Sequence, residues 1–166
     1  MNITDIHIRG EIKVDYSSRI LYSTDASAYR EIPLGVAYPK DIEDIRVLVI
    51  FAGKNRINLI PRAGGTSLAG QVVGNGLVVD ISKYMNRILE INKGEHWVRV
   101  QPGVVLDELN LYCKPYGLFF GPETSTSNRC CLSGMVGNNS CGSHSLVYGS
   151  CLLYTSPSPR DVEESR

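Results

Sequence analysis

The spacing of apolar residues changes several times along the chain, and each change marks an expected element. Residues 39–52 carry apolar side chains every three to four positions, which is typical of an amphipathic helix. Pro39 would end the preceding extended segment and Asp41 would cap the first turn. The expected core face comprises Ile42, Ile45, Val49 and Ala52, with Leu48 beside them. Gly53 is placed to end this helix.

Short apolar runs predict strands between and after the helices. The strands are expected at 57–60, 77–80, 88–92 and 97–101. The last two flank Lys93-Gly94-Glu95, which predicts a β-hairpin. A second amphipathic helix is expected over 105–112, ending before Pro115. Residues 22–36 read as an irregular segment. This alternation of helices and strands predicts an α+β domain with a mixed sheet.

Composition and charge limit the classes of function and the partners that the chain can have. Lys plus Arg and Asp plus Glu both number 17, so no net field attracts nucleic acid or anionic lipid. No apolar run approaches the roughly 20 residues of a transmembrane helix, and residues 1–15 lack the apolar core of a signal peptide. We therefore expect a cytoplasmic location. The five cysteines lack framework spacing and are expected to be reduced, buried thiols. The three histidines lack metal-ligand spacing, so no metal site is expected.

A glycine-rich loop, residues 61–76, directly follows the strand predicted at 57–60. Its first half contains Arg62, Ala63, Gly64, Gly65, Thr66 and Ser67. Consecutive glycines allow successive N–H groups to converge on an anion, and the two hydroxyls add donors. A phosphate or pyrophosphate is the expected guest, although an ordinary glycine-rich turn is the alternative. Gln71 and Val72 replace the Lys and Ser/Thr of a P-loop, and no G-x-G-x-x-G sequence occurs.

A second polar segment, residues 121–149, is dense in Gly, Ser, Thr and Asn. A stretch of this length without strong periodicity is usually disordered or a binding surface. Its hydroxyls and amides could satisfy phosphate, ribitol hydroxyls and the edges of a heterocycle. A flexible linker is the alternative, but linkers rarely contain Cys, Met, Val and paired Asn in such quantity.

The two segments, in this order, resemble the FAD-binding domain of the vanillyl-alcohol oxidase and p-cresol methylhydroxylase superfamily. Four stretches resemble its D-lactate dehydrogenase and glycolate oxidase branch: 22–27, 61–71, 101–104 and 122–149. Within the last, 122–130 and 137–145 are most similar to long members, in which a flavin dehydrogenase is fused to an iron–sulfur module. The resemblance spans residues 22–150, preceded by a lead-in at 1–21.

This resemblance implies a p-cresol methylhydroxylase-type fold of two small α/β subdomains with mixed sheets, the second one incomplete. It assigns the FAD pyrophosphate to Arg62, Ala63, Gly64, Gly65, Thr66 and Ser67. It assigns the flavin and the rest of the cradle to Pro122, Glu123, Thr124, Ser125, Ser127, Gly134, Gly137, Asn138, Asn139, Ser140, Gly142 and Ser143. Thr66 stands where covalent members carry the histidine that links to the flavin, so non-covalent FAD is expected.

The resemblance also implies an activity for the parent protein. That protein would oxidise a 2-hydroxy acid such as D-lactate and pass electrons to a non-oxygen acceptor, and its remaining part could hold iron–sulfur clusters. Catalytic and metal-binding residues would lie outside this chain, and His144 is expected to be structural. Two alternatives remain open: a reductase resembling UDP-N-acetylenolpyruvoylglucosamine reductase, and a nucleotide-binding fragment without catalysis. A location at the periphery of the inner membrane is compatible with the branch.

Composition changes abruptly after Ser150. The run from Cys151 to Asp161 resembles the in-frame translation of a transposase-type sequencing adapter. We therefore expect 151–166 to be a disordered artefact, with the domain truncated at Ser150. The alternative is a natural Ser/Pro-rich tail.

Overall fold

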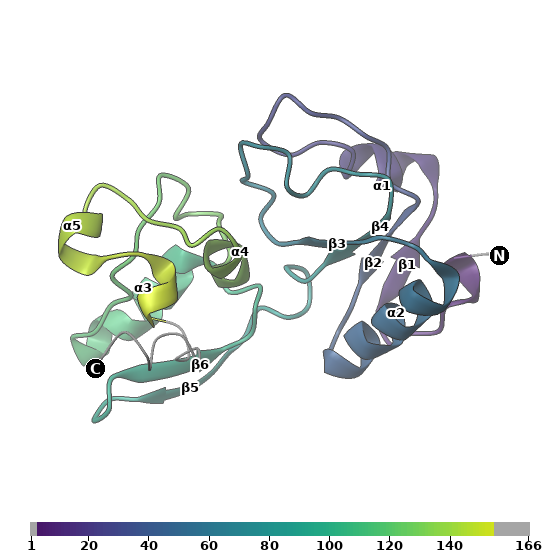
Figure 1. The fold of residues 1–166 in the computed structure, drawn as a ribbon. Helices are drawn as coiled ribbons and strands as arrows, with labels where there is room; N and C mark the ends of the chain where they lie inside the picture. Colours follow the sequence, from purple (N-terminus) through teal and green to yellow (C-terminus); the bar gives the residue numbers. More distant parts are fainter. Residues whose placement is uncertain (1–2, 155–166) are drawn as a thin grey trace, which may run out of the picture.

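The computed structural model describes residues 3–154, which form two lobes joined near residue 81 (Figure 1). The first lobe contains η1 (Ile3–Asp5), β1 (Glu11–Lys13), α1 (Tyr16–Leu21), β2 (Gly35–Tyr38), α2 (Ile42–Asn55), β3 (Leu59–Arg62) and β4 (Leu77–Asp80). The second contains β5 (Ile88–Asn92), β6 (Trp97–Val100), α3 (Leu106–Cys113), η2 (Lys114–Tyr116), α4 (Leu132–Gly137), α5 (Ser145–Tyr148) and η3 (Cys151–Tyr154).

The first lobe is built on a mixed sheet in the order β1-β2-β4-β3. Strand β1 is antiparallel to β2, whereas β2, β4 and β3 run parallel. All four residues of β4 are buried, as the continuous apolar run at 77–80 leads one to expect for a central parallel strand. In the second lobe β5 and β6 form the predicted antiparallel hairpin. The α+β class and the mixed sheet are therefore confirmed.

Helix α2 begins as predicted but ends later. The Asp41 carboxylate accepts the N–H of Asp44 at 3.0 Å, which confirms the cap. The helix then continues through Gly53 to Asn55, so the predicted end at Gly53 is wrong. Arg56 takes the left-handed conformation instead, with φ of 53°, and its N–H bonds to the carbonyl of Ala52. Nothing lies within 4 Å of a side chain added at Gly53, so the packing does not require glycine there.

The buried face of α2 is also rotated from the prediction. Leu48 is fully buried, whereas Ile42 and Val49 are 72% and 53% exposed. The cause is Asp44, which is 3% exposed on the same face as Leu48. Its carboxylate accepts three backbone N–H groups at 2.8–3.0 Å, from Arg9, Gly10 and Lys40. A hydrophobic periodicity count cannot register a buried aspartate that turns its helix toward three donors.

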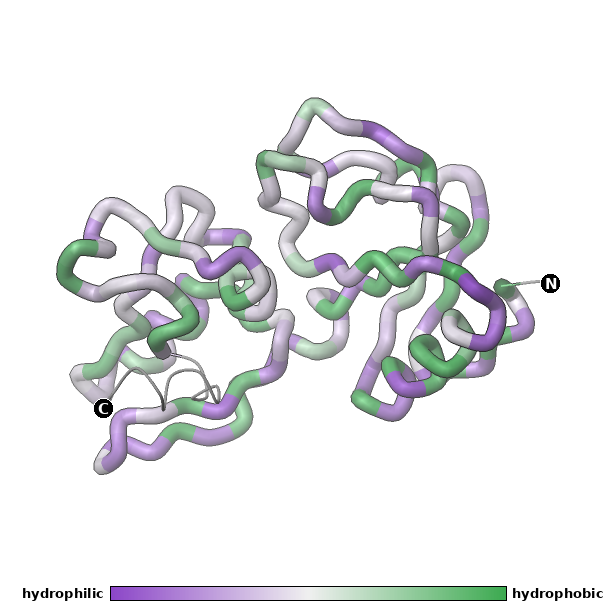
Figure 2. Tube along the Cα trace, in the orientation of Figure 1, coloured by the Kyte–Doolittle hydropathy of each residue, from purple (hydrophilic) through white to green (hydrophobic). Residues whose placement is uncertain are grey.

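Each lobe has its own apolar core (Figure 2). The first core gathers Ile6, Ala37, Leu48, Leu77 and Val79 between the sheet and α2. The second gathers Val104, Leu106, Leu109, Cys113, Cys130, Leu132, Met135 and Cys151. All five cysteines are free thiols. Cys113, Cys130, Cys131 and Cys151 are buried, as predicted for small apolar side chains, whereas Cys141 is exposed, so the prediction is wrong at that position.

The expected artefact segment falls partly inside the described chain. Residues 151–154 form η3, and Cys151 is fully buried against the second core. Its N–H donates to the Ser140 carbonyl at 2.9 Å. The expectation that these four residues are disordered therefore does not hold in the structure. The rest of that segment, 155–166, lies outside the described residues.

Within residues 3–154, no helix has the length and apolarity to cross a membrane. Over the same residues, no group of three or more His, Cys, Asp or Glu side chains could hold a metal ion.

The rotation of α2 gives a direct test of the first core. Leu48→Ala should lower the free energy of unfolding by about 2–5 kcal/mol, because it leaves a cavity in a fully buried site. Ile42→Ala, on the same helix but mostly exposed, should change it by less than about 0.5 kcal/mol. Urea denaturation followed by circular dichroism measures both. Equal losses of stability in the two variants would contradict the observed burial and support the buried face predicted from the sequence.

Candidate functional site

The glycine loop after β3 is pressed against the second lobe. A side-chain carbon added at Gly64 would lie 2.4 Å from the carbonyl oxygen of Arg129, far inside contact distance. One added at Gly134 would lie 3.5 Å from the Ala63 methyl. Gly65 follows with φ of 63°, the left-handed conformation in which neighbouring N–H groups can form an anion nest. The glycine loop of the first lobe therefore lies against the start of α4 in the second lobe.

Arg62, the last residue of β3, contacts both this loop and the 22–24 segment. Its Nη1 donates to the carbonyl of Thr24 at 2.8 Å, and its guanidinium lies 5.0 Å from the centre of the Tyr22 ring. A side-chain carbon at Gly65 would meet the guanidinium at 2.6 Å, so the group lies directly against the glycine turn. The 22–24 segment and the glycine loop are thus held together by one cation.

Tyr22 is also hydrogen-bonded to Asp80. Its hydroxyl donates to Asp80 Oδ2 at 2.5 Å, and Oδ1 of the same carboxylate accepts the N–H and hydroxyl of Ser82 at 2.8 and 2.6 Å. Asp80 is 5% exposed. Burial of the phenol, and next its bond to the carboxylate, raises the pKa of Tyr22 far above its usual value. Because Arg62 and Asp80 are paired at the ends of β3 and β4, the sheet register brings the network together.

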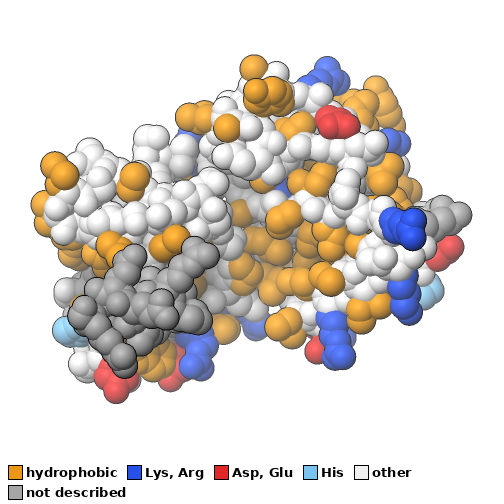
Figure 3. Space-filling view, in the orientation of Figure 1, with side chains coloured by type: hydrophobic (Ala, Val, Ile, Leu, Met, Phe, Trp, Pro, Cys, Tyr) orange, Lys and Arg blue, Asp and Glu red, His pale blue; other side chains and the backbone are white. Residues whose placement is uncertain are grey.

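The charge of the site is positive at the glycine loop. Among residues 3–154, neither Arg62 nor Arg129 forms an ion pair with a carboxylate. The adjoining upper face of the second lobe carries few charged side chains (Figure 3). A left-handed glycine beside the Arg62 guanidinium, which forms no direct ion pair among residues 3–154, is an environment suited to a phosphate or diphosphate.

The segment from 122 to 131 runs from the buried Pro122 to the start of α4. The Thr124 hydroxyl lies 3.2 Å from the Thr126 hydroxyl and 3.3 Å from Cys130 Sγ. Ser125 and Ser127 belong to the turn that follows. Burial raises the pKa of the Cys131 thiol to about 11, although an N–H from Gly64 opposes the shift. That thiol is therefore a packed group and not a reactive one.

Glu123 connects the beginning and the end of the second polar segment. Its Oε1 accepts the Ser143 hydroxyl at 2.6 Å and lies 2.6 Å from Nδ1 of His144. A side-chain carbon at Gly142 would lie 2.4 Å from the Glu123 carbonyl oxygen. The Ser143 hydroxyl, and after it His144, holds the pKa of Glu123 below its ordinary value. His144 takes part in this cluster on the protein surface, with 63% of its side chain exposed.

The structure brings eight of the eighteen predicted site residues into two groups. Residues 62–65 meet 129–134, and Glu123 meets 142–143. Gly137, Asn138 and Asn139 lie at the far end of α4 and are exposed. Asn139 accepts the N–H of Leu152, and Ser140 donates its N–H to Met135. The structure therefore does not bring these four residues to the glycine loop.

Two features of the site were not found by sequence reasoning. Helices α4 and α5 occupy parts of the polar segment expected to lack regular structure, because Leu132 and Met135 provide α4 with a buried face. Tyr22 and Asp80 were not proposed as site residues. The available signal was positional: Arg62 and Asp80 are the last residues of two apolar strands followed by loops.

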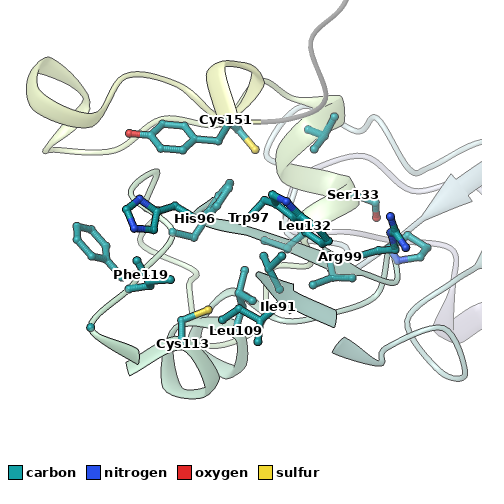
Figure 4. Close-up of a pocket in the computed structure, with 18 residues that line it drawn as sticks. Ile91, His96, Trp97, Arg99, Leu109, Cys113, Phe119, Leu132, Ser133 and Cys151 are labelled. Atoms are coloured by element: carbon teal, nitrogen blue, oxygen red, sulfur yellow. The ribbon is translucent and has the colours of Figure 1, made fainter. Parts of the chain in front are cut away.

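Two cavities within residues 3–154 lie outside residues 62–67 and the 122–131 segment. One of about 1100 Å³ is lined mainly by apolar side chains of β5, β6, α3, α4 and η3, including Ile91, Leu109 and Leu132 (Figure 4). A smaller one of about 300 Å³ lies between residues 29–31 and 69–73. Neither is lined by any predicted cofactor residue. The larger lacks the glycine-loop donors that a phosphate requires, so it is not the candidate site.

The comparisons with known proteins agree with this geometry. The family described as the FAD binding domain matches residues 33–154, which include both loops. The chain therefore belongs to the FAD binding domain family, whose members are built to hold that cofactor.

The relatives are oxidoreductases. The chain is 46% identical over 144 residues to D-2-hydroxyglutarate dehydrogenase of Pseudomonas putida, covering 85% of this chain and 14% of the relative. It is 34% identical over 140 residues to the mitochondrial cytochrome-type D-lactate dehydrogenase of Kluyveromyces lactis, covering 82% of this chain and 24% of that protein. The chain thus spans a small part of these relatives.

A solved structure shows the same fold. 6-Hydroxy-D-nicotine oxidase from Arthrobacter nicotinovorans superposes with a TM-score of 0.76 at 22% identity, over 91% of this chain and 33% of that one. The p-cresol methylhydroxylase-type fold expected from the two glycine-rich segments is confirmed.

Tyr22→Phe tests the network beneath the glycine loop. It should lower the free energy of unfolding by about 1 kcal/mol at neutral pH, because Asp80 Oδ2 loses its donor. A raised pKa means that the folded state holds this proton more tightly. The stabilisation is therefore complete below the phenol's ordinary pKa and declines as pH rises above about 10. Urea denaturation at several pH values measures it.

Tyr16→Phe is the matched control, since Tyr16 is 69% exposed. It should change stability by less than about 0.5 kcal/mol. A loss at Tyr22 no greater than at Tyr16 would show that the bond to Asp80 contributes nothing.

Proposed function

We propose that this chain is the FAD-binding part of a flavin-dependent oxidoreductase that oxidises a 2-hydroxy acid. The observation that carries the proposal is the contact of Gly64 with Arg129, which unites the two glycine-rich segments in one site. The diphosphate would lie on the loop at 62–67, and the isoalloxazine ring would lie along 122–143. Gly65 in its left-handed conformation and the unpaired Arg62 support the first half of this assignment.

The proposed cofactor residues are the two sets expected from the sequence, without Glu123 and Ser143, which bond to each other. Backbone N–H groups of 63–67 would bind the diphosphate, and the guanidinium of Arg62 would hold the loop in shape while contributing positive charge. Thr66 is half-buried in this loop and offers no imidazole for a covalent link, which supports non-covalent binding. When bound, FAD supplies the redox chemistry, because it accepts the hydride equivalent from the hydroxy acid. The chain's own residues bind and orient it.

The substrate proposal rests on the relatives. Those 44–46% identical to the chain are named for D-2-hydroxyglutarate, whereas the one named for D-lactate is 34% identical. We therefore place D-2-hydroxyglutarate ahead of D-lactate as substrate of the whole protein. These relatives favour a hydroxy-acid dehydrogenase over the UDP-N-acetylenolpyruvoylglucosamine reductase alternative.

Several finer expectations belong to the same proposal. The substrate-binding residues would lie in the part of the protein that this chain does not include. The electron acceptor would be a cytochrome or iron–sulfur centres in preference to oxygen. The K. lactis relative is named for a cytochrome, which supports this choice. A cytoplasmic or membrane-peripheral location is proposed as well.

Purified chain titrated with FAD tests the binding site. Flavin fluorescence should be quenched at saturation, and riboflavin, which lacks the diphosphate, should bind at least about tenfold more weakly. Gly64→Ala should weaken FAD binding at least about tenfold, because the added carbon collides with the Arg129 carbonyl. Acid precipitation should release all of the flavin.

Gly53→Ala is the matched control, because nothing lies within 4 Å of its added carbon on α2. It should bind FAD like the wild-type chain. Equal affinity for riboflavin and FAD would contradict a diphosphate site at the glycine loop, whatever the variants do.

Substrate reduction separates the chain from the whole protein. With FAD bound to this chain under anaerobic conditions, D-2-hydroxyglutarate should leave the flavin oxidised. The complete protein should bleach its flavin with D-2-hydroxyglutarate and more slowly with D-lactate. Bleaching in the chain alone would place the substrate site within residues 1–166.

A further inference from the structure

Glu123 lies between two segments of chain that would otherwise be joined weakly. Residues 121–124 have no regular secondary structure, and 142–144 form a turn before the four-residue α5. Their main chains are in van der Waals contact, since only a glycine at 142 fits beside the Glu123 carbonyl. The side chain of Glu123 then reaches across to Ser143 and His144. It bonds to both at 2.6 Å through one oxygen.

One oxygen of the carboxylate, Oε1, is already occupied by protein donors. Oε1 accepts the Ser143 hydroxyl, which makes no other side-chain hydrogen bond among residues 3–154. Because Glu123 Oε1 and the Ser143 hydroxyl hydrogen bond to each other, both are poorly placed to recognise a ligand as well. A carboxylate is also a poor neighbour for the phosphates of a dinucleotide. Both facts argue against direct cofactor contact by either side chain.

We infer that Glu123 and Ser143 are positioning residues, which hold the 121–124 and 142–144 segments together and act on the cofactor only through that geometry. This inference rests on the proposed function, because the two segments flank the proposed position of the flavin. It changes the role expected from the sequence, where both residues were assigned to the cofactor. For this role the side chain at position 123 must accept the hydrogen bond from Ser143, and this matters more than its negative charge.

Four variants of the whole 166-residue chain test this role by FAD titration. Glu123→Ala and Ser143→Ala should each weaken FAD binding about tenfold, because each removes the same charge-assisted bond. The double variant should be no weaker than either single one, since the second change has nothing further to remove. Glu123→Gln keeps an oxygen acceptor for Ser143 and should recover most of the affinity.

Thermal unfolding of every variant provides the second measurement. All should unfold within a few degrees of the wild type, because the cluster is exposed, so the loss of affinity would not follow from unfolding. Glu90→Ala is the matched control: it breaks another exposed ion pair, with Arg99 on the β5–β6 hairpin, and should leave FAD affinity unchanged.

The outcomes separate the two proposals. Losses that add up in the double variant would show that each residue touches the cofactor independently, and would overturn the inference. Wild-type affinity in Glu123→Ala would overturn it too, as would a Glu123→Gln variant as weak as Glu123→Ala. Wild-type chain that binds no FAD at all would instead refute the proposed function, and with it the site these residues would position.

Discussion

The structure depends on the close approach of two main chains, Gly64 in the first lobe and Arg129 in the second. Each lobe has its own apolar core, so neither core requires the other lobe for its packing. The two glycine-rich segments become one site only where a residue without a side chain lets the backbones touch. Any larger residue at 64 would separate the loop from the start of α4.

The loop at this junction is held by the strands that precede and follow it. Because β3 and β4 are parallel and in register, Arg62 and Asp80 stand side by side where the chain leaves the sheet. Tyr22 lies between their charges, bonded to the carboxylate and stacked on the guanidinium. The buried Asp80 carboxylate thus holds both the segment that contains Tyr22 and the loop that begins at Ser82. This arrangement follows the general tendency of ligand sites to form at the carboxyl ends of parallel strands.

Sequence reasoning was accurate where apolar spacing or turn chemistry decides the structure. The cap at Asp41, the hairpin around Gly94 and the buried strand at 77–80 all follow from local pattern. It failed where a single polar side chain overrides that pattern. Asp44 rotates α2 by drawing three N–H groups to a buried carboxylate, and no count of apolar positions contains that information. Helix α4 was missed because glycines at 134 and 137 conceal the buried Met135 between them.

The proposed site has opposite polarity at its two ends, and this bears on how a dinucleotide would lie in it. The Arg62 guanidinium lies against the glycine loop and forms no direct ion pair among residues 3–154, whereas Glu123 places a carboxylate among 121–144. A diphosphate is attracted to the first end and repelled by the second, while the flavin ring tolerates a neutral or weakly anionic wall. Charge therefore favours one orientation of FAD, with the diphosphate at residues 62–67 and not at the carboxylate of Glu123.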